Sequence, residues 1–177
     1  MAWSVKAWRA RRWLTWIGLG LLVIATHGLA NRGHNDDISG AARVIDVDTL
    51  QVGTHRIRLA GIDAPEHDQT CRFPDGERPC GREVTAALAG RLHGVTVQCA
   101  AQNQDRYGRT VAYCRADGED IGRWLVSGGL ARAWGAYRLE EWQAWMAGRG
   151  LWQSQWEAPW VFRERQRERQ GEAARGR

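Results

Sequence analysis

Three short motifs in this chain combine carboxylates with arginines. The first is the run from Arg56 to Glu66, which presents arginines and then two carboxylates. The second is Asp-Val-Asp-Thr at residues 46–49, and the third is Asp-Arg-Tyr-Gly-Arg at residues 105–109. Carboxylate oxygens bind hard cations, and arginine forks grip phosphate oxygens. If the three motifs meet in the fold, they supply what metal-assisted attack on a phosphodiester requires.

The charged residues of these motifs have separate candidate roles. Asp48 and Asp63 offer hard oxygen ligands, which suit Ca²⁺ or Mg²⁺ better than Zn²⁺, and a loose site completed by a turn carbonyl and waters favours Ca²⁺. Arg58 and Arg109 provide planar, permanently charged forks for phosphate oxygens. Glu66 is placed to orient or deprotonate the attacking water, a general-base role worth roughly 10²- to 10⁴-fold in rate.

A strand followed by a stiff turn must position the first motif. Between residues 56 and 61, polar or small side chains alternate with aliphatic ones, which predicts a half-buried strand with Arg58 on the face opposite the aliphatic residues. Pro65 ends the strand and keeps the preceding residue extended, so Asp63 and Glu66 are held at a fixed separation. Alone, this motif is better explained by a salt-bridged strand end before a helix. The two other motifs favour an active centre.

The remaining elements follow from hydrophobic periodicity and turn residues. A loop rich in charge, Gly and Pro is predicted over residues 67–81. Strands are predicted over residues 41–45, 49–52, 55–61, 95–100 and 110–115. Helices are predicted over residues 82–92, 121–127 and 139–147.

Length and charge indicate one domain with terminal extensions. The 177 residues carry a net charge of +5, but residues 1–30 hold four basic residues and no acidic one, and residues 163–177 hold six Arg against three Glu. The body between them is therefore slightly acidic, which neither supports nor excludes nucleic-acid binding. We expect a linker over residues 31–40, the domain over residues 41–162, and a charged tail over residues 163–177 that is disordered or a frayed helix.

Residues 1–30 have the pattern of a signal peptide or a short membrane anchor. The apolar run at residues 13–25 is shorter than the ~20 residues that a spanning helix prefers. Small residues at 28–30 favour cleavage after Ala30, and the Arg11-Arg12 pair is only a faint twin-arginine signal. In either case we expect export, to the periplasm or beyond, with an inner-membrane anchor if the segment is retained.

The four cysteines fall into two candidate pairs. Cys71 and Cys80 lie near the two ends of the predicted loop, and Cys99 and Cys114 lie on the two strands that flank the third motif. Disulfides persist in oxidising compartments, so this interpretation agrees with export and is favoured over free thiols. A zinc site would need closely spaced cysteines, which this sequence lacks.

Taken together and in order, the motifs resemble the staphylococcal nuclease-like (thermonuclease) domain family over about residues 41–160. The stretches that carry this resemblance are residues 44–50, 56–66, 105–109, 129–131 and 150–152. The resemblance implies an OB-fold, five-stranded β-barrel with three helices, that is, an α+β class of structure. It also implies a calcium-dependent endonuclease that hydrolyses DNA and RNA. No symmetric interface signal is visible in the sequence, so a monomer is the default.

The resemblance assigns roles by position. The implied calcium ligands are Asp48, Asp63 and the backbone carbonyl of Ala64. The implied catalytic residues are Arg58 and Arg109, which contact phosphate, and Glu66. Two further tyrosines fall where family members approach the nucleotide, namely Tyr107 and Tyr137.

This chain departs from the family at several positions. Val47 stands where the family has glycine, and Gly135 where it has an aromatic residue. The C-terminal part is rich in tryptophan, and we expect these side chains to pack the C-terminal segment onto the barrel rather than to stack on bases. They are Trp142, Trp145, Trp152, Trp156 and Trp160. Three histidines have no metal-site spacing and are expected at the surface, namely His55, His67 and His93.

Two other classes of function stay open. The chain could be a non-catalytic OB module that binds single-stranded nucleic acid or protein in the cell envelope. It could also be a disulfide-bonded envelope protein with structural duties alone. The presence of all the acidic and arginine residues named above favours the enzyme.

Overall fold

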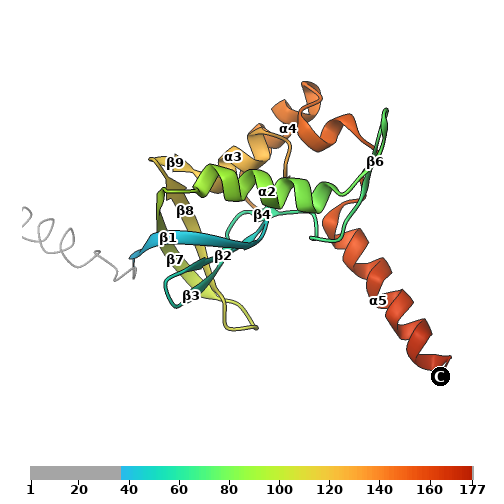
Figure 1. Ribbon diagram of the computed structural model, residues 1–177, viewed down its shortest axis with the longest axis horizontal. Coiled ribbons are helices and arrows are strands. Elements are labelled where there is room, and N and C mark those ends of the chain that lie inside the picture. The colour runs from blue at the N-terminus through green and yellow to red at the C-terminus, as the bar shows by residue number, and fades with distance from the viewer. Residues whose placement is uncertain (1–36, 177) are drawn as a thin grey trace, which may run out of the picture. The chain divides into compact units, whose positions relative to one another are not determined.

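Five strands close into a β-barrel in the computed structural model, which describes residues 37–176 (Figure 1). The sheet order is β3-β2-β1-β7-β8-β9, and a parallel pairing of β3 with β8 closes it. The strands of this sheet are β1 (Asp37–Asp46), β2 (Thr49–Val52), β3 (His55–Leu59), β7 (Thr96–Gln104), β8 (Thr110–Ala116) and β9 (Glu119–Asp120). The predicted fold class is confirmed, and the predicted leader lies outside the described residues.

Smaller elements and helices surround the barrel. Strand β4 (Ile62–Asp63) pairs with β10 (Arg132–Ala133), and β5 (Cys71–Phe73) forms a hairpin with β6 (Gly76–Arg78). The helices are α2 (Cys80–Leu92), α3 (Ile121–Ser127), α4 (Arg138–Met146), the 3₁₀ helix η1 (Gly150–Gln153) and α5 (Pro159–Arg175). The described residues therefore contain one α-helix more than the three predicted.

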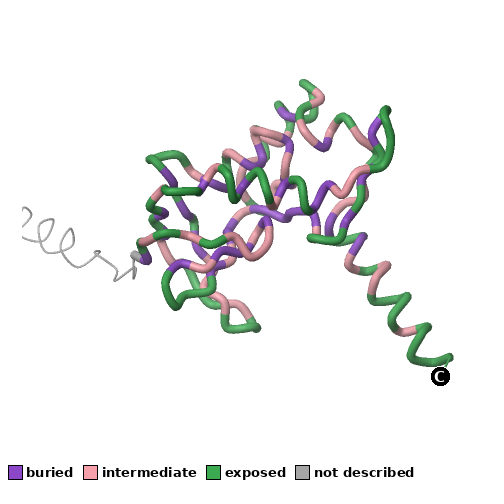
Figure 2. The backbone as a smooth tube through the Cα atoms, in the orientation of Figure 1, coloured by how far each residue is buried: buried purple, intermediate pink, exposed green. Residues whose placement is uncertain are grey.

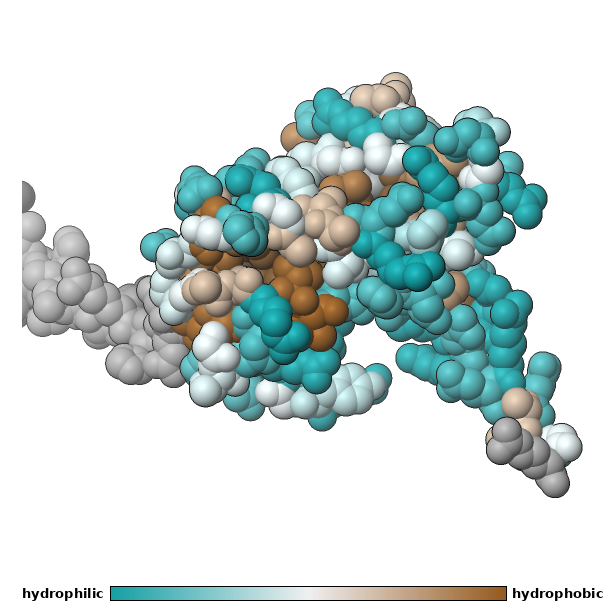
Figure 3. Space-filling model, in the orientation of Figure 1, coloured by the Kyte–Doolittle hydropathy of each residue, from teal (hydrophilic) through white to brown (hydrophobic). Residues whose placement is uncertain are grey.

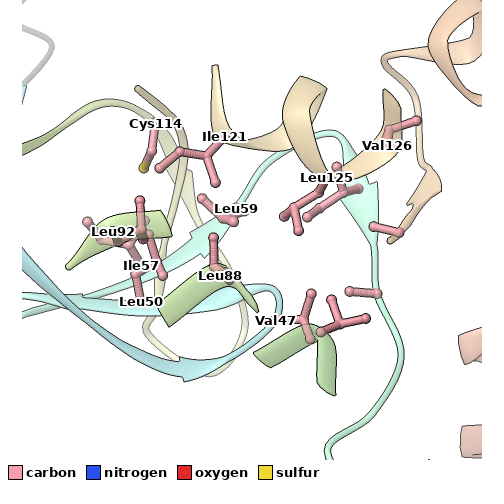
Figure 4. Close-up of a cluster of buried hydrophobic side chains, with 14 of the residues drawn as sticks. Val47, Leu50, Ile57, Leu59, Leu88, Leu92, Cys114, Ile121, Leu125 and Val126 are labelled. Carbon is pink, nitrogen blue, oxygen red and sulfur yellow. The ribbon is translucent and has the colours of Figure 1, made fainter. Parts of the chain in front are cut away.

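The core forms where α2 and α3 cover the barrel interior (Figure 4). Leu50 and Ile57 come from neighbouring strands and are fully buried, as is Leu88 of α2. Buried residues on α2 recur every four positions, as expected for one helical face. Val47, which replaces the family glycine, is also fully buried in this cluster, so its side chain packs inward at the β1–β2 turn.

Strand β1 begins at Asp37, four residues before the predicted start at Ala41. Residues 37–41 pair with residues 96–100 of β7, and Ile38 is buried in the core. This part of the predicted linker is therefore strand, because pairing with β7 and burial of one isoleucine outweigh the polar composition. The predicted loop over residues 67–81 likewise contains the β5–β6 hairpin.

Both predicted disulfides are present. Cys71 bonds Cys80 with 5.6 Å between their Cα atoms, and Cys99 bonds Cys114 across β7 and β8 with 4.1 Å between their Cα atoms. No cysteine is free. The first bond ties the β5–β6 hairpin to the start of α2, and the second lies within the barrel wall.

Helix α5 covers the segment for which we predicted a tail that is disordered or a frayed helix. Pro159 occupies the first helical turn, where its missing N–H is not needed, and Phe162 is buried at 6% exposure. The helix beyond this anchor is mostly exposed and hydrophilic and projects from the domain (Figures 2 and 3). Packing of the first turn therefore decides the state of a segment whose composition alone suggested disorder.

The tryptophan prediction is confirmed only in part. The rings of Trp152 and Trp156 meet edge to face at 5.7 Å, and Trp156 packs against the core. Trp142 and Trp145 of α4 are each 55% exposed, so these two do not pack the C-terminal segment onto the barrel. None of the helices within residues 37–176 is both long and apolar enough to cross a membrane. The three histidines expected at the surface, His55, His67 and His93, are exposed.

Candidate active site

The three sequence motifs meet in a cleft of about 540 Å³ at one end of the barrel. The cleft lies where the β1–β2 turn, the chain after β3 and the β7–β8 turn come together. Six arginines and four carboxylates line it. The lining residues are Ile45, Asp46, Asp48, Thr49, Arg56, Arg58, Glu66, Asp105, Arg106, Tyr107, Arg109, Arg163 and Arg167.

Barrel closure brings the second and third motifs to the first. Thr49 of β2 is directly opposite Arg58 of β3, so the β1–β2 turn lies beside this arginine. The parallel register of β3 and β8 then sets Arg58 opposite Val111, which places Arg109 at the same end of the barrel. The two phosphate-binding candidates thus come from strands far apart in sequence.

Arg58 is held by the two carboxylates that were predicted as metal ligands. Its Nη1 lies 2.5 Å from Oδ2 of Asp48, and its Nη2 lies 3.9 Å from Oδ1 of Asp63. The Thr49 hydroxyl donates a hydrogen bond of 2.7 Å to Oδ1 of Asp48. The side chain of Asp63 is only 4% exposed, and Ala64 beside it is buried as well. An ionised carboxylate at this depth requires a cationic partner.

Arg109 is oriented by the Asp105 turn. Its Nε donates to Oδ2 of Asp105 at 2.7 Å, and its Nη1 donates to the hydroxyl of Thr49 at 3.2 Å. Oδ1 of Asp105 accepts the backbone N–H groups of Tyr107 and Arg109. Burial alone would raise the pKa of Asp105, but these hydrogen bonds to its ionised form outweigh burial and lower the pKa.

The two candidate tyrosines lie in different parts of the structure. Tyr107 lines the cleft, is 69% exposed and has the guanidinium groups of Arg106 and Arg109 over its ring at 4.9 and 5.7 Å. Tyr137 lies elsewhere: its hydroxyl donates to Asp120 at 2.8 Å. Burial and this hydrogen bond raise the pKa of Tyr137 well above its ordinary value. The structure therefore does not bring Tyr137 to the cleft.

Asp46 lines the cleft beside the predicted ligands. Its Oδ1 accepts the backbone N–H of Val47 at 2.8 Å. Burial raises the pKa of Asp46, and the charges of Asp48 and Glu66 raise it further, against the effect of that hydrogen bond. Burial is therefore the main reason why the pKa of Asp46 lies above its ordinary value.

Glu66 is positioned by a buried residue that sequence reasoning did not identify. Gln69 is fully buried, and its Oε1 accepts the Glu66 backbone N–H at 3.3 Å, while its Nε2 donates to the carbonyl of Glu157 at 2.7 Å. A Cβ atom at Gly81 would overlap the Glu66 carbonyl, so only glycine fits there. The turn that carries Glu66 is thus fastened both to α2 and to the chain that leads into α5.

Arg163 of helix α5 is the second residue that the sequence analysis missed. Its Nη1 donates to Oδ1 of Asp63 at 3.0 Å and to Oε1 of Glu66 at 2.8 Å, and its Nη2 donates to Oδ2 of Asp63 at 3.0 Å. Burial disfavours the charged guanidinium, but these hydrogen bonds outweigh it and raise the pKa of Arg163. The one available signal was the helical spacing of Trp160, Arg163 and Arg167 after Pro159.

Asp48, Asp63 and Glu66 are all carboxylates, which is the type of ligand that a hard divalent cation prefers. Their arrangement, however, surrounds guanidinium groups, because Arg58 and Arg163 lie between them. Within residues 37–176, no three or more His, Cys, Asp or Glu side chains converge on a point that could hold an ion. A cation would have to replace guanidinium contacts with these carboxylates.

Comparison with known proteins gives a family match over much of the domain. Residues 56–154 match the family described as "Staphylococcal nuclease homologue". The match runs from β3 to η1 and includes Arg58, Asp63, Glu66 and Arg109. The resemblance inferred from the motifs is therefore confirmed.

Three relatives illustrate how the similarity is distributed. "Succinoglycan biosynthesis protein ExoI" of Rhizobium meliloti is 35% identical over 145 residues, covering 77% of this chain and 76% of the relative. An "Uncharacterized endonuclease" of Escherichia coli O157:H7 is 32% identical over 142 residues, covering 73% and 87%. "Probable staphylococcal-like nuclease CAN1" of Oryza sativa is 33% identical over 120 residues, covering 64% of this chain and 34% of the plant protein.

Proposed function

Because the chain belongs to the family of staphylococcal nuclease homologues, we propose that it is an exported, calcium-dependent endonuclease that hydrolyses phosphodiester bonds of DNA and RNA. One observation carries this proposal: the carboxylates and arginines of three separate motifs line or border a single cleft. Nuclease names among the relatives support the same reaction class.

The two arginines stabilise charge on the phosphate. Arg58 and Arg109 each use part of the guanidinium to hold a carboxylate, which fixes the direction of the remaining N–H groups. These N–H groups donate to the non-bridging oxygens as negative charge grows on them. Donors that are already oriented contribute most in a partly buried site, and removal of one such donor typically reduces the rate by about 10²- to 10³-fold.

Glu66 accepts a proton from the attacking water. The water oxygen forms a bond to phosphorus, the bond from phosphorus to the leaving ester oxygen breaks, and the leaving oxygen takes up a proton from the solvent. Gln69 and Gly81 keep the backbone of Glu66 in place, so its side chain extends into the cleft from a fixed position. Such fixed placement is what general-base catalysis requires.

Asp48, Asp63 and the backbone carbonyl of Ala64 are the residues that would hold the calcium ion. When bound, this ion supplies charge compensation at a phosphate oxygen and a site for water. The hard oxygen donors and the turn geometry support Ca²⁺ over Zn²⁺.

The cleft recognises features that DNA and RNA share. Its arginines address phosphates, and the exposed ring of Tyr107 offers a flat surface to a sugar or base. No base-specific donor set follows from these residues, so we propose that both nucleic acids are substrates.

Export is supported by the disulfides and by the leader pattern. Two disulfides in a domain of this size are typical of an oxidising compartment. We place the protein in the periplasm or outside the cell, as a monomer, with membrane contact only through residues 1–30 if they are retained.

Degradation of circular single-stranded DNA by the full-length chain tests the proposal. The substrate has no ends, so cleavage identifies an endonuclease. We expect cleavage with Ca²⁺ and loss of cleavage with a chelator, and the same result with single-stranded RNA. Cleavage with Mg²⁺ alone would contradict the assigned ion, and no cleavage by a correctly folded chain with either ion would favour a non-catalytic binding module.

A further inference from the structure

We propose that Arg163 of helix α5 is a positioning residue that competes with the metal ion for Asp63 and also pairs with Glu66 beside it. The inference rests on the proposed function, because it concerns the carboxylates of the same site. It assigns to the C-terminal helix a part in the reaction that the family match over residues 56–154 does not include.

The contacts of Arg163 occupy both carboxylate oxygens of Asp63, which a metal would need, and one oxygen of Glu66. Both carboxylate oxygens of Asp63 accept from Arg163 at 3.0 Å, and Glu66 accepts at 2.8 Å. Two parallel hydrogen bonds from one guanidinium to one carboxylate form a strong, directional pair. A divalent cation can bind Asp63 only after at least one of these bonds is broken.

The burial of Asp63 explains why this carboxylate has a close cationic partner on α5. The Asp63 side chain is 4% exposed, and Arg58 reaches only to 3.9 Å from it. A buried carboxylate without a close cationic partner is strongly destabilising. Arg163 therefore stabilises the metal-free site, while it raises the energy needed to load an ion.

Arg163 can withdraw without movement of its helix. The start of α5 is fixed by the buried Phe162, and the chain before it is held through the bond from Gln69 to Glu157. The Arg163 side chain itself is 31% exposed at the cleft. A long, solvent-accessible side chain on a fixed helix can change rotamer while the backbone stays in place.

Metal titration of the full-length Arg163→Gln variant tests the competition. By isothermal titration calorimetry, we expect Ca²⁺ to bind this variant about 10- to 100-fold more tightly than the unmodified chain. We also expect a lower melting temperature than the unmodified chain in chelator, and a larger rise in melting temperature on addition of Ca²⁺. If Arg163 had a purely structural role, the variant would show the lower melting temperature in chelator without tighter binding of Ca²⁺.

Two further variants sharpen the test. Arg167→Gln removes a cleft arginine one turn further along α5, and its Ca²⁺ affinity should stay within about twofold of the unmodified chain. Arg163→Lys keeps the charge but loses the paired hydrogen bonds, so its affinity should lie between the two extremes. This variant also serves if Arg163→Gln does not fold.

Equal or weaker Ca²⁺ binding by Arg163→Gln and Arg163→Lys would overturn the competition. If the unmodified chain still cleaves DNA with Ca²⁺ in that case, the proposed function stands and only the role of Arg163 fails. If no chain binds Ca²⁺ or Mg²⁺ and none cleaves DNA, both proposals fail.

Discussion

Each of the two arginines predicted to contact phosphate is paired with a carboxylate of its own. Arg58 pairs with Asp48, and Arg109 pairs with Asp105. Thr49 joins the two pairs, since its hydroxyl donates to Asp48 and accepts from Arg109. At the scale of single residues, the site is therefore a connected network in which the guanidinium groups are fixed before a substrate arrives.

Removal of either arginine should abolish most of the activity and leave the fold intact. We expect Arg58→Ala and Arg109→Ala each to reduce kcat by about 10²-fold or more, because each removes an oriented donor from the transition state. The matched control is Arg115→Ala, an exposed arginine on β8 away from the cleft, which should keep full activity. Single-turnover cleavage of a short oligonucleotide gives the measurement, and unchanged rates in both variants would contradict the mechanism.

Asp105 should give the domain a pH-dependent contribution to stability. Its pKa in the folded protein lies below its ordinary value of 3.8, so its stabilising effect is present above that pH and is lost as the pH falls through the lowered pKa. Asp105→Asn keeps the side-chain oxygen but loses the charge. We expect this variant to melt about 1–5 °C lower at pH 7, with a difference that shrinks below pH 3.8. A difference that is constant down to pH 2.5 would refute this account.

Some of the elements around the barrel hold the acidic turn as well as contribute to the core. The Cys71–Cys80 bond, Gln69 and the start of α2 all meet the segment that carries Glu66. The Cys99–Cys114 bond lies between β7 and β8, where the strands already pair. The first disulfide therefore restrains the segment beside Glu66, whereas the second links two strands that already pair.

Removal of the two disulfides one at a time should separate stability from activity. The Cys99→Ser/Cys114→Ser variant should lose about 2–4 kcal/mol of unfolding free energy and keep its turnover in the folded state. The Cys71→Ser/Cys80→Ser variant should lose stability and also turnover, because the loop beside Glu66 is released. Urea unfolding and cleavage assays on the same samples give both quantities. Equal turnover losses would show that neither bond acts on the site specifically.

At the scale of the whole molecule, α5 connects the C-terminus to the cleft. Its first turn packs through Phe162 and delivers Arg163, whereas its distal half is almost entirely exposed. Only the proximal part of the helix therefore contributes to the folding stability of the domain.

Two truncations should divide α5 into these parts. Deletion of residues 168–177 should change the melting temperature in chelator by less than about 2 °C, because exposed positions contribute little. Deletion of residues 159–177 should lower it by about 5 °C or more, because Phe162 loses its packing and Asp63 loses its close cation. Circular dichroism melts give the comparison, and equal melting temperatures for the two truncated chains would rule out this division.

The sequence by itself determined most of the barrel and most of the cleft. Alternation and turn residues predicted the strands, the order of the motifs carried the resemblance that implied the fold class, and the positions of the four cysteines predicted both disulfides. These features are local, because periodicity, proline geometry and cysteine spacing act over a few residues. The acidic and arginine residues of the three motifs follow from the same local patterns.

Only the tertiary structure decided what those residues contact. The closure of β3 on β8 sets Arg109 beside Arg58, and the buried turn of Gln69 fixes Glu66. Tyr137 is turned toward Asp120 instead of the cleft. The tail, predicted as disordered or a frayed helix, is a helix whose Arg163 pairs with Asp63. Such contacts join residues up to 100 positions apart. They depend on packing geometry, and neither composition nor periodicity contains that information.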